Sequence, residues 1–246
     1  MMASSSLIKR SFATIVVATV NILYPACACN SYDVESDDPM NTGDSHWEKG
    51  DYSASISAYR QALHKDTLDY VVWGRLAQAY SSQGNLSAAD IYLKKSVAGF
   101  MNVGQRALDS GNDSLALKYY QDLLEIDPSN SMAYYFIGDI YSRSGEDEGA
   151  IGSYLRATKL DSFNYNTWVN LADVYTKRGE TVGAIEAYNK AISLNINSYR
   201  SYMGLGSIYL EQKEFPLAQS NFKTALLIKP DLGNALSALE YITSLQ

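Results

Sequence analysis

Between residues 133 and 232 the large apolar and the small side chains return to the same positions every 34 residues. Each copy contains two stripes of such residues, spaced three and four positions apart, which places each stripe on one face of a helix. In the middle copy the stripes are Trp168, Leu171 and Tyr175, and then Ala184, Tyr188 and Ala191. A fixed period with this content predicts a repeat protein built from helix pairs.

Small and turn-forming residues mark where these helices meet and end. Gly145 and Gly179 lie between the two stripes of their copies, where a helix end favours a left-handed residue. Pro128 and Pro230 follow the second stripe and interrupt helical hydrogen bonding. One helix pair cannot bury its own apolar face, so successive pairs must stack. The pattern therefore predicts an all-α solenoid of antiparallel helix pairs.

The motif W-x2-L-G-x2-Y, followed by G, A-x3-Y and A, resembles the tetratricopeptide repeat (TPR) family. The resemblance implies a right-handed superhelix in which the first helices line a concave groove. It extends to about six repeats and a closing helix. The expected repeats are about 36–69, 70–96, 97–130, 131–164, 165–198 and 199–232, with the capping helix at 233–246.

Two places depart from the regular repeat. The unit at 70–96 is seven residues short, so we expect a helix over 87–96 to continue directly into a helix over 97–109. Gly99 and Gly104 would weaken this fused helix, which predicts a hinge or a change in stacking direction. In the first unit, Pro39 stands where the later repeats have an aromatic residue. We therefore expect a flexible linker over 29–45 with a frayed first helix, and the repeat domain proper over 46–246.

The first 28 residues have the features of a signal peptide. Lys9 and Arg10 precede an apolar stretch at residues 11–24, and Ala26-Cys27-Ala28 fits a small-residue cleavage site. Cleavage there would leave Cys29 first, which resembles the lipidated cysteine of bacterial lipoproteins. Cys29 is thus the candidate lipidation site, and we expect an exported, membrane-anchored protein of the cell envelope that faces the periplasm. A secreted protein without lipid and an uncleaved anchor or organelle presequence remain alternatives.

Charge and reactive residues restrict the function. The chain has a formal net charge of −7, and without the basic leader 18 basic residues stand against 27 acidic ones, which disfavours nucleic acid. Beyond the leader there is no cysteine pair and only two histidines, His46 and His64. Zinc needs three or four ligands, so we expect no metal site, no cofactor, no small-molecule substrate and no catalytic residue.

The candidate site is the groove formed by the first helices, which suits a peptide or a partner helix. Its predicted lining mixes apolar residues with both charge signs. These residues are Met132, Tyr135, Asp139, Arg143, Asn166, Val169, Asn170, Asp173, Lys177, Arg200, Met203, Ser207 and Glu211.

One known TPR subclass holds chaperone C-termini in a carboxylate clamp of Lys, Asn, Asn, Lys and Arg. The corresponding positions are Tyr135, Asp139, Asn170, Arg200 and Gly204. Only Asn170 and Arg200 fit, and Asp139 would repel a carboxylate, so the sequence argues against this clamp.

These observations predict a non-catalytic scaffold of the cell envelope that binds a protein or peptide. By family analogy alone, such a scaffold supports pilus, secretin or exopolysaccharide export assembly. A secreted peptide- or glycan-binding module and a non-catalytic subunit of an enzyme complex are the alternatives.

Overall fold

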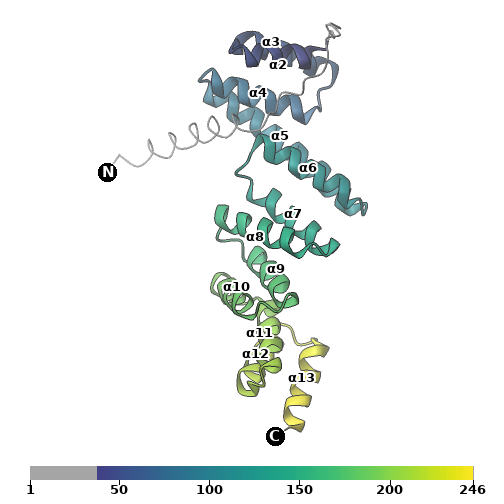
Figure 1. Ribbon diagram of the computed structural model, residues 1–246, viewed down its shortest axis with the longest axis vertical. Coiled ribbons are helices and arrows are strands. Elements are labelled where there is room, and N and C mark those ends of the chain that lie inside the picture. The colour runs from purple at the N-terminus through teal and green to yellow at the C-terminus, as the bar shows by residue number, and fades with distance from the viewer. Residues whose placement is uncertain (1–37, 246) are drawn as a thin grey trace, which may run out of the picture. The chain divides into compact units, whose positions relative to one another are not determined.

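The computed structural model describes residues 38–245, over which the chain forms twelve α-helices and no strand (Figure 1). The chain divides into two compact units, one that ends at Asn102 and one that begins at Val103. The predicted signal peptide and Cys29 lie outside the described residues. Within residues 38–245, no helix combines the length and apolar character needed to cross a membrane.

The first unit contains α2 (Pro39–Glu48), α3 (Tyr52–Lys65), α4 (Tyr70–Ser82) and the first part of α5 (Leu86–Asp109). Helix α2 packs against α3, and α3 packs against α4. Their shared core is formed by buried apolar side chains, chiefly Ile56, Tyr59, Val72, Leu76 and Tyr80.

The flexible linker predicted over residues 29–45 is wrong for its last part, because α2 already begins at Pro39. The Asp38 carboxylate accepts a hydrogen bond from the backbone N–H of Met40 at 3.1 Å, which caps the helix. Pro39 occupies the first turn, where its missing N–H costs nothing. Gly43 lets the Tyr59 ring approach so closely that a Cβ atom would lie 2.4 Å from it. Capping and close packing thus compensate for the weak apolar stripe.

The expected fusion of two helices is confirmed, since α5 runs without interruption from Leu86 to Asp109. Its two glycines have a packing role that the sequence did not reveal. A Cβ atom on Gly99 would lie 2.0 Å from the Tyr70 ring, and one on Gly104 would lie 2.7 Å from the Tyr120 ring. Both residues therefore allow an aromatic ring to rest directly on the α5 backbone. The hinge stays a prediction.

The second unit continues with helix pairs that each pack on the next pair. After α6 (Asp113–Ile126), the pairs are α7 (Ser131–Ser144) with α8 (Asp147–Leu160), α9 (Tyr165–Lys177) with α10 (Thr181–Leu194), and α11 (Tyr199–Glu211) with α12 (Phe215–Ile228). Helix α13 (Gly233–Ser244) packs on α12 and covers the last apolar cluster. The predicted stack of helix pairs and the closing helix are confirmed.

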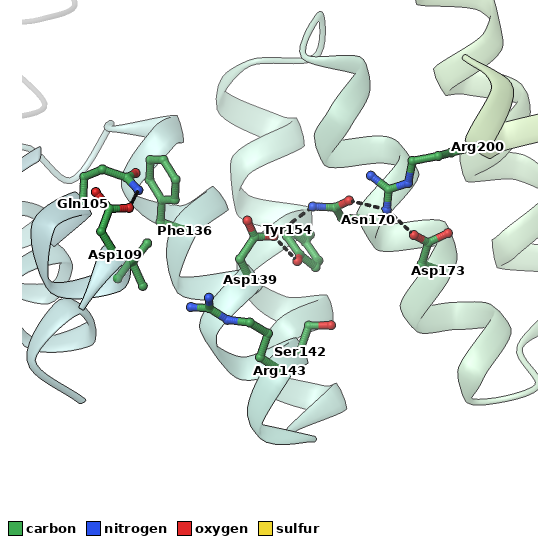
Figure 2. Close-up of a pocket in the computed structure, with 11 residues that line it drawn as sticks. Gln105, Asp109, Phe136, Asp139, Ser142, Arg143, Tyr154, Asn170, Asp173 and Arg200 are labelled. Atoms are coloured by element: carbon green, nitrogen blue, oxygen red, sulfur yellow. Dashed lines mark hydrogen bonds and ion pairs between the residues drawn. The ribbon is translucent and has the colours of Figure 1, made fainter. Parts of the chain in front are cut away.

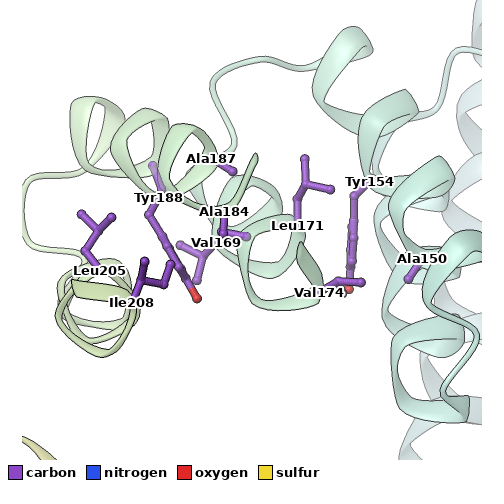
Figure 3. Packing of buried hydrophobic residues seen from close by; sticks show 12 residues of the cluster. Ala150, Tyr154, Val169, Leu171, Val174, Ala184, Ala187, Tyr188, Leu205 and Ile208 are labelled. Carbon is purple, nitrogen blue, oxygen red and sulfur yellow. The ribbon is translucent and has the colours of Figure 1, made fainter. Parts of the chain in front are cut away.

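The core of the second unit consists of the residues that recur in the sequence. Tyr154, Leu171 and Tyr188 are each no more than 2% exposed, and Figure 3 shows Tyr188 beside Val169 and Ile208. The two helices of each pair are joined by a short turn, in which Gly145 and Gly179 have φ values of 83° and 74°. Such left-handed positions favour glycine, as the sequence predicted.

A methyl group added at two glycines should have opposite effects on stability. Gly204→Ala places a Cβ atom 2.2 Å from Cζ of the buried Tyr188 ring, so we expect the free energy of unfolding to fall by about 1–3 kcal/mol. Gly152→Ala, on the exposed face of α8, meets no atom within 4 Å and should raise it by about 0.5–1 kcal/mol. Urea unfolding of both variants measures the difference, and equal effects would contradict this packing.

Candidate functional site

A hollow of about 400 Å³ lies in the second unit, along the first helices of successive pairs (Figure 2). Four of its five contributing helices, α5, α7, α9 and α11, occupy the first position of their repeats, and only α8 occupies the second. Its lining residues are Gln105, Leu108, Asp109, Phe136, Asp139, Ser142, Arg143, Tyr154, Asn170, Asp173 and Arg200. The hollow therefore extends over four consecutive repeats.

Three repeats contain the same hydrogen bond between their two helices. A tyrosine on the second helix reaches across and donates its hydroxyl to an aspartate fifteen residues earlier, on the first helix. The pairs are Tyr59 with Asp44 at 2.5 Å, Tyr154 with Asp139 at 2.5 Å, and Tyr188 with Asp173 at 2.6 Å. Burial, reinforced by the aspartate, raises the pKa of each tyrosine above its usual value, so the hydroxyl keeps its proton and remains the donor.

Two of these aspartates are joined across helices by further polar contacts, which together we call the polar ladder. The Asn170 amide donates to Oδ1 of Asp139 at 2.8 Å. The Arg200 guanidinium donates to Oδ1 of Asn170 at 3.1 Å and to Oδ2 of Asp173 at 2.5 Å. The ladder, drawn as dashed lines in Figure 2, connects α7, α9 and α11.

Asp139 lies at the most enclosed point of the ladder. Burial raises the pKa of its carboxyl group above the usual 3.8, and the hydrogen bonds from Tyr154 and Asn170 oppose this shift. Burial removes water from the carboxylate, whereas the two donors replace part of that hydration. Asp139 is therefore a carboxylate held in place by its donors rather than by an ion pair.

The repeat that contains α5 and α6 lacks this tyrosine–aspartate bond. Gln105 stands at the aspartate position, fifteen residues before Tyr120, and it donates to the Asp109 carboxylate at 2.8 Å instead. The Tyr120 hydroxyl is fully buried and has no hydrogen-bond partner among the described residues. Burial raises the pKa of Tyr120 to about 12, so it too stays protonated. In the last repeat both partners are changed, to Ser207 and Phe222, so the second helix has no hydroxyl at this position.

Ion pairs that recur with the repeat lie beside the hollow. Arg143 contacts Asp113 at 2.9 Å, and Lys177 contacts Asp147 at 2.7 Å, each linking a first helix to the start of the preceding second helix. Exposed pairs of this kind typically contribute below about 1 kcal/mol each. We expect them to orient side chains rather than to determine stability.

The structure brings together five of the thirteen predicted groove residues, namely Asp139, Arg143, Asn170, Asp173 and Arg200. The prediction for Val169 is wrong, because its side chain is 1% exposed and belongs to the core with Leu205 and Ile208. The next helix pair covers this flank of α9, which the pattern of a single helix does not indicate.

The remaining predicted residues lie outside the hollow. Tyr135 and Met203 pack against core clusters, and the Tyr135 hydroxyl also accepts a bond from Asn170 at 3.3 Å. Met132 is 37% exposed. Lys177 is held by its ion pair, and the other three are exposed, namely Asn166, Ser207 and Glu211. For these residues the predicted contact with a partner stays a prediction.

Sequence reasoning missed the contribution of α5, although the signal was present. Gln105 and Asp109 stand exactly one period of 34 residues before Asp139 and Arg143. Phe136 was also missed, because it lies beside Tyr135 and outside the repeating stripe.

Across residues 38–245, no group of three or more His, Cys, Asp or Glu side chains is placed to hold a metal ion. The hollow thus offers hydrogen bonds, charges and one aromatic wall.

Comparison with family models finds matches along most of the described chain. Models described as tetratricopeptide repeat match residues 40–99, 104–165 and 199–232, and one described as TPR repeat matches residues 172–213. No curated protein sequence matches the chain.

Solved structures with a similar fold include those of MamA, YrrB and the APC/C hetero-tetramer Cut9–Hcn1. MamA is 26% identical, with a TM-score of 0.50 over 78% of this chain and 96% of that chain. YrrB, described as a TPR protein with an unusual peptide-binding site, is 16% identical, with a TM-score of 0.56 over 75% and 99%. A chain of the APC/C hetero-tetramer Cut9–Hcn1 is 19% identical, with a TM-score of 0.55 over 83% and 42%.

Removing the hydroxyl from Tyr154 and from Tyr120 should affect stability differently, because only the Tyr154 hydroxyl forms a hydrogen bond within the described residues. Tyr154→Phe deletes a hydrogen bond to a carboxylate, so we expect the free energy of unfolding to fall by about 1.5–3 kcal/mol. Tyr120→Phe deletes a buried hydroxyl without a partner and should leave stability unchanged or raise it. Urea denaturation measures both values. Equal losses would show that Tyr120 has a partner in solution.

Proposed function

Because the chain belongs to the tetratricopeptide repeat family, we propose that it is a non-catalytic scaffold that holds a protein or peptide partner against α5, α7, α9 and α11. The observation that carries this proposal is the hollow of about 400 Å³ whose lining spans four consecutive repeats. A partner that lies along it would contact every repeat in turn, as an extended segment or a helix does.

The polar ladder supports binding because it fixes the groups that a partner would meet. Arg200 is held by Asn170 and Asp173, and Asp139 is held by Tyr154 and Asn170. Side chains that are already ordered lose less conformational entropy when a partner binds. The description of YrrB shows that a peptide-binding protein has this fold, while its 16% identity limits the likeness to the fold itself.

A photo-crosslinking residue placed in the hollow should capture the partner. Ser142, which lines the hollow on α7, is replaced by p-benzoylphenylalanine, and the protein is irradiated in its own cells. We expect a distinct covalent adduct of higher mass, which mass spectrometry then identifies. The control is the same replacement at Leu227 on α12, which is 84% exposed and does not line the hollow. An adduct at Leu227 with none at Ser142 would contradict binding in the groove.

We also propose that the scaffold acts at the cell envelope, exported by residues 1–28 and anchored through Cys29. The support comes from the basic Lys9-Arg10 pair, the apolar stretch that follows it and the small residues before Cys29. An acylated cysteine adds apolar surface of about 0.8 kcal/mol per buried methylene, enough for stable attachment when several chains are present. Pilus, secretin or exopolysaccharide export assemblies are the partners that this location would suit.

Lipid attachment at Cys29 has a direct test. Cells are labelled with an alkyne analogue of palmitate, and the protein is immunoprecipitated and coupled to a fluorophore. We expect labelling of the wild type and none of Cys29→Ala, because the acyl chain needs this sulfur. Cys27→Ala, two residues earlier, serves as the matched control and should still be labelled. An unlabelled wild type would exclude the lipid anchor and leave the scaffold proposal intact.

A further inference from the structure

Tyr120 is the one tyrosine of its repeat position whose hydroxyl lacks an acceptor. Tyr59, Tyr154 and Tyr188 each donate to an aspartate, whereas the Tyr120 side chain is 0% exposed and its hydroxyl has no partner among the described residues. A buried polar group without a hydrogen bond is unfavourable and requires an explanation. Tyr120 does not itself line the hollow, but the charges of Asp109, Asp139 and Arg143, which do line it, act on its hydroxyl.

The hollow also contains two carboxylates that form no salt bridge within the described residues. Three aspartates and two arginines line it. Arg200 pairs with Asp173, and Arg143 pairs with Asp113, which does not line the hollow. Within residues 38–245, neither Asp109 nor Asp139 forms a salt bridge. At the end of the hollow formed by α5 and α7, these two carboxylates stand against one cation, Arg143, which also acts on Asp139. This end is therefore net negative, which favours a positively charged ligand.

The position of Asp109 is unfavourable for the stability of its helix. It is the last residue of α5, next to the negative end of the helix dipole. Its one hydrogen bond within the described chain comes from Gln105, an exposed side chain on the same helix. An acidic residue that disfavours its own helix end and points into a hollow is suited to contact with a partner rather than to stability.

Apolar walls complete this end of the hollow. The Phe136 ring stacks on Tyr120 with centroids 5.0 Å apart and an angle of 10° between the rings. Leu108 lines the hollow from α5, and Phe136 lines it from α7. A lysine or arginine side chain combines an aliphatic stem, which such walls cover, with a charged end that seeks carboxylates. Aromatic faces also attract these cations.

We propose that this end of the hollow binds a lysine or arginine side chain of the partner, with its charge between Asp109 and Asp139 and its stem along Leu108 and Phe136. The proposal rests on the scaffold function and specifies the chemistry of the partner. A carboxylate ligand would face both aspartates and is disfavoured. The site therefore selects a basic segment, opposite in charge to the ligand of the chaperone clamp.

Small blocked amino acids test the site without knowledge of the partner. The purified protein, labelled with ¹⁵N, is titrated with N-acetyl-lysine methylamide, with the arginine equivalent, and with the norleucine and glutamate equivalents as controls. We expect saturable amide shifts at Gln105, Asp109 and Phe136 for the two cationic probes. The norleucine and glutamate probes should give no saturable shifts.

Three variants decide whether the named groups are responsible. Asp109→Asn should weaken binding of the cationic probes about tenfold, as loss of a charged hydrogen bond does, and should retain or raise the melting temperature. Tyr120→Phe removes a buried hydroxyl that does not line the hollow, and it should leave binding of the cationic probes unchanged. Glu240→Gln, which removes the same charge from an exposed position on α13, should have no effect.

The outcomes separate this inference from the scaffold function. Cationic probes that bind Asp109→Asn as tightly as the wild type would overturn the inference, as would equal binding of the glutamate probe or no saturable binding. A partner that still crosslinks at Ser142 in Asp109→Asn with unchanged yield would also overturn it, while leaving the scaffold in place. If Ser142 captures nothing, the scaffold proposal fails, and the probe titrations report on the site alone.

Discussion

The contact on which the second unit depends is an aromatic ring laid directly on the backbone of a neighbouring helix. Gly138 receives the ring of Tyr154, Gly204 receives that of Tyr188, and a Cβ atom at either place would lie within 2.6 Å of the ring. The missing side chain allows the two helices to approach, and the ring fills the space between them. In the pair of α7 and α8, the ring on Gly138 also carries the Tyr154 hydroxyl to Asp139 on the first helix, whereas the Gly204 contact joins α10 to the first helix of the next pair. Packing and the polar groups of the site thus have one geometric origin.

The polar ladder follows from that origin. Once Tyr154 and Tyr188 reach across their pairs, Asp139 and Asp173 are fixed as acceptors, and Asn170 is left to connect them to Arg200. Because these side chains satisfy one another, the groove there presents an ordered polar surface. The α5 end differs by two exchanges, Gln105 in place of the aspartate and Asp109 in place of a basic residue. The first leaves the Tyr120 hydroxyl without an acceptor, and the second adds a carboxylate that forms no salt bridge within the described residues.

The sequence predicted those features that the repeat period expresses. The helix pairs and the closing helix could be predicted because the apolar stripe recurs with the repeat period. The fused helix α5 could be predicted because one repeat is seven residues short. The sequence failed where long-range packing decides. Helix α2 forms because Asp38 caps it and Gly43 admits Tyr59, and Val169 is buried because a later pair covers it. The tyrosine–aspartate bonds were not predicted, since a fifteen-residue separation matches no helical spacing and becomes visible only when two helices are side by side.

The ladder has a consequence for how the chain loses structure. In a solenoid each repeat contacts only its neighbours, so unfolding spreads along the array according to the strength of each interface. Hydrogen bonds that join α7 to α9 and α9 to α11 strengthen two successive interfaces at once. The three helix pairs from α7 to α12 should therefore melt as one cooperative block. The pair of α5 and α6, which no ladder bond joins to the rest of the described chain, then forms a boundary at which local opening can stop.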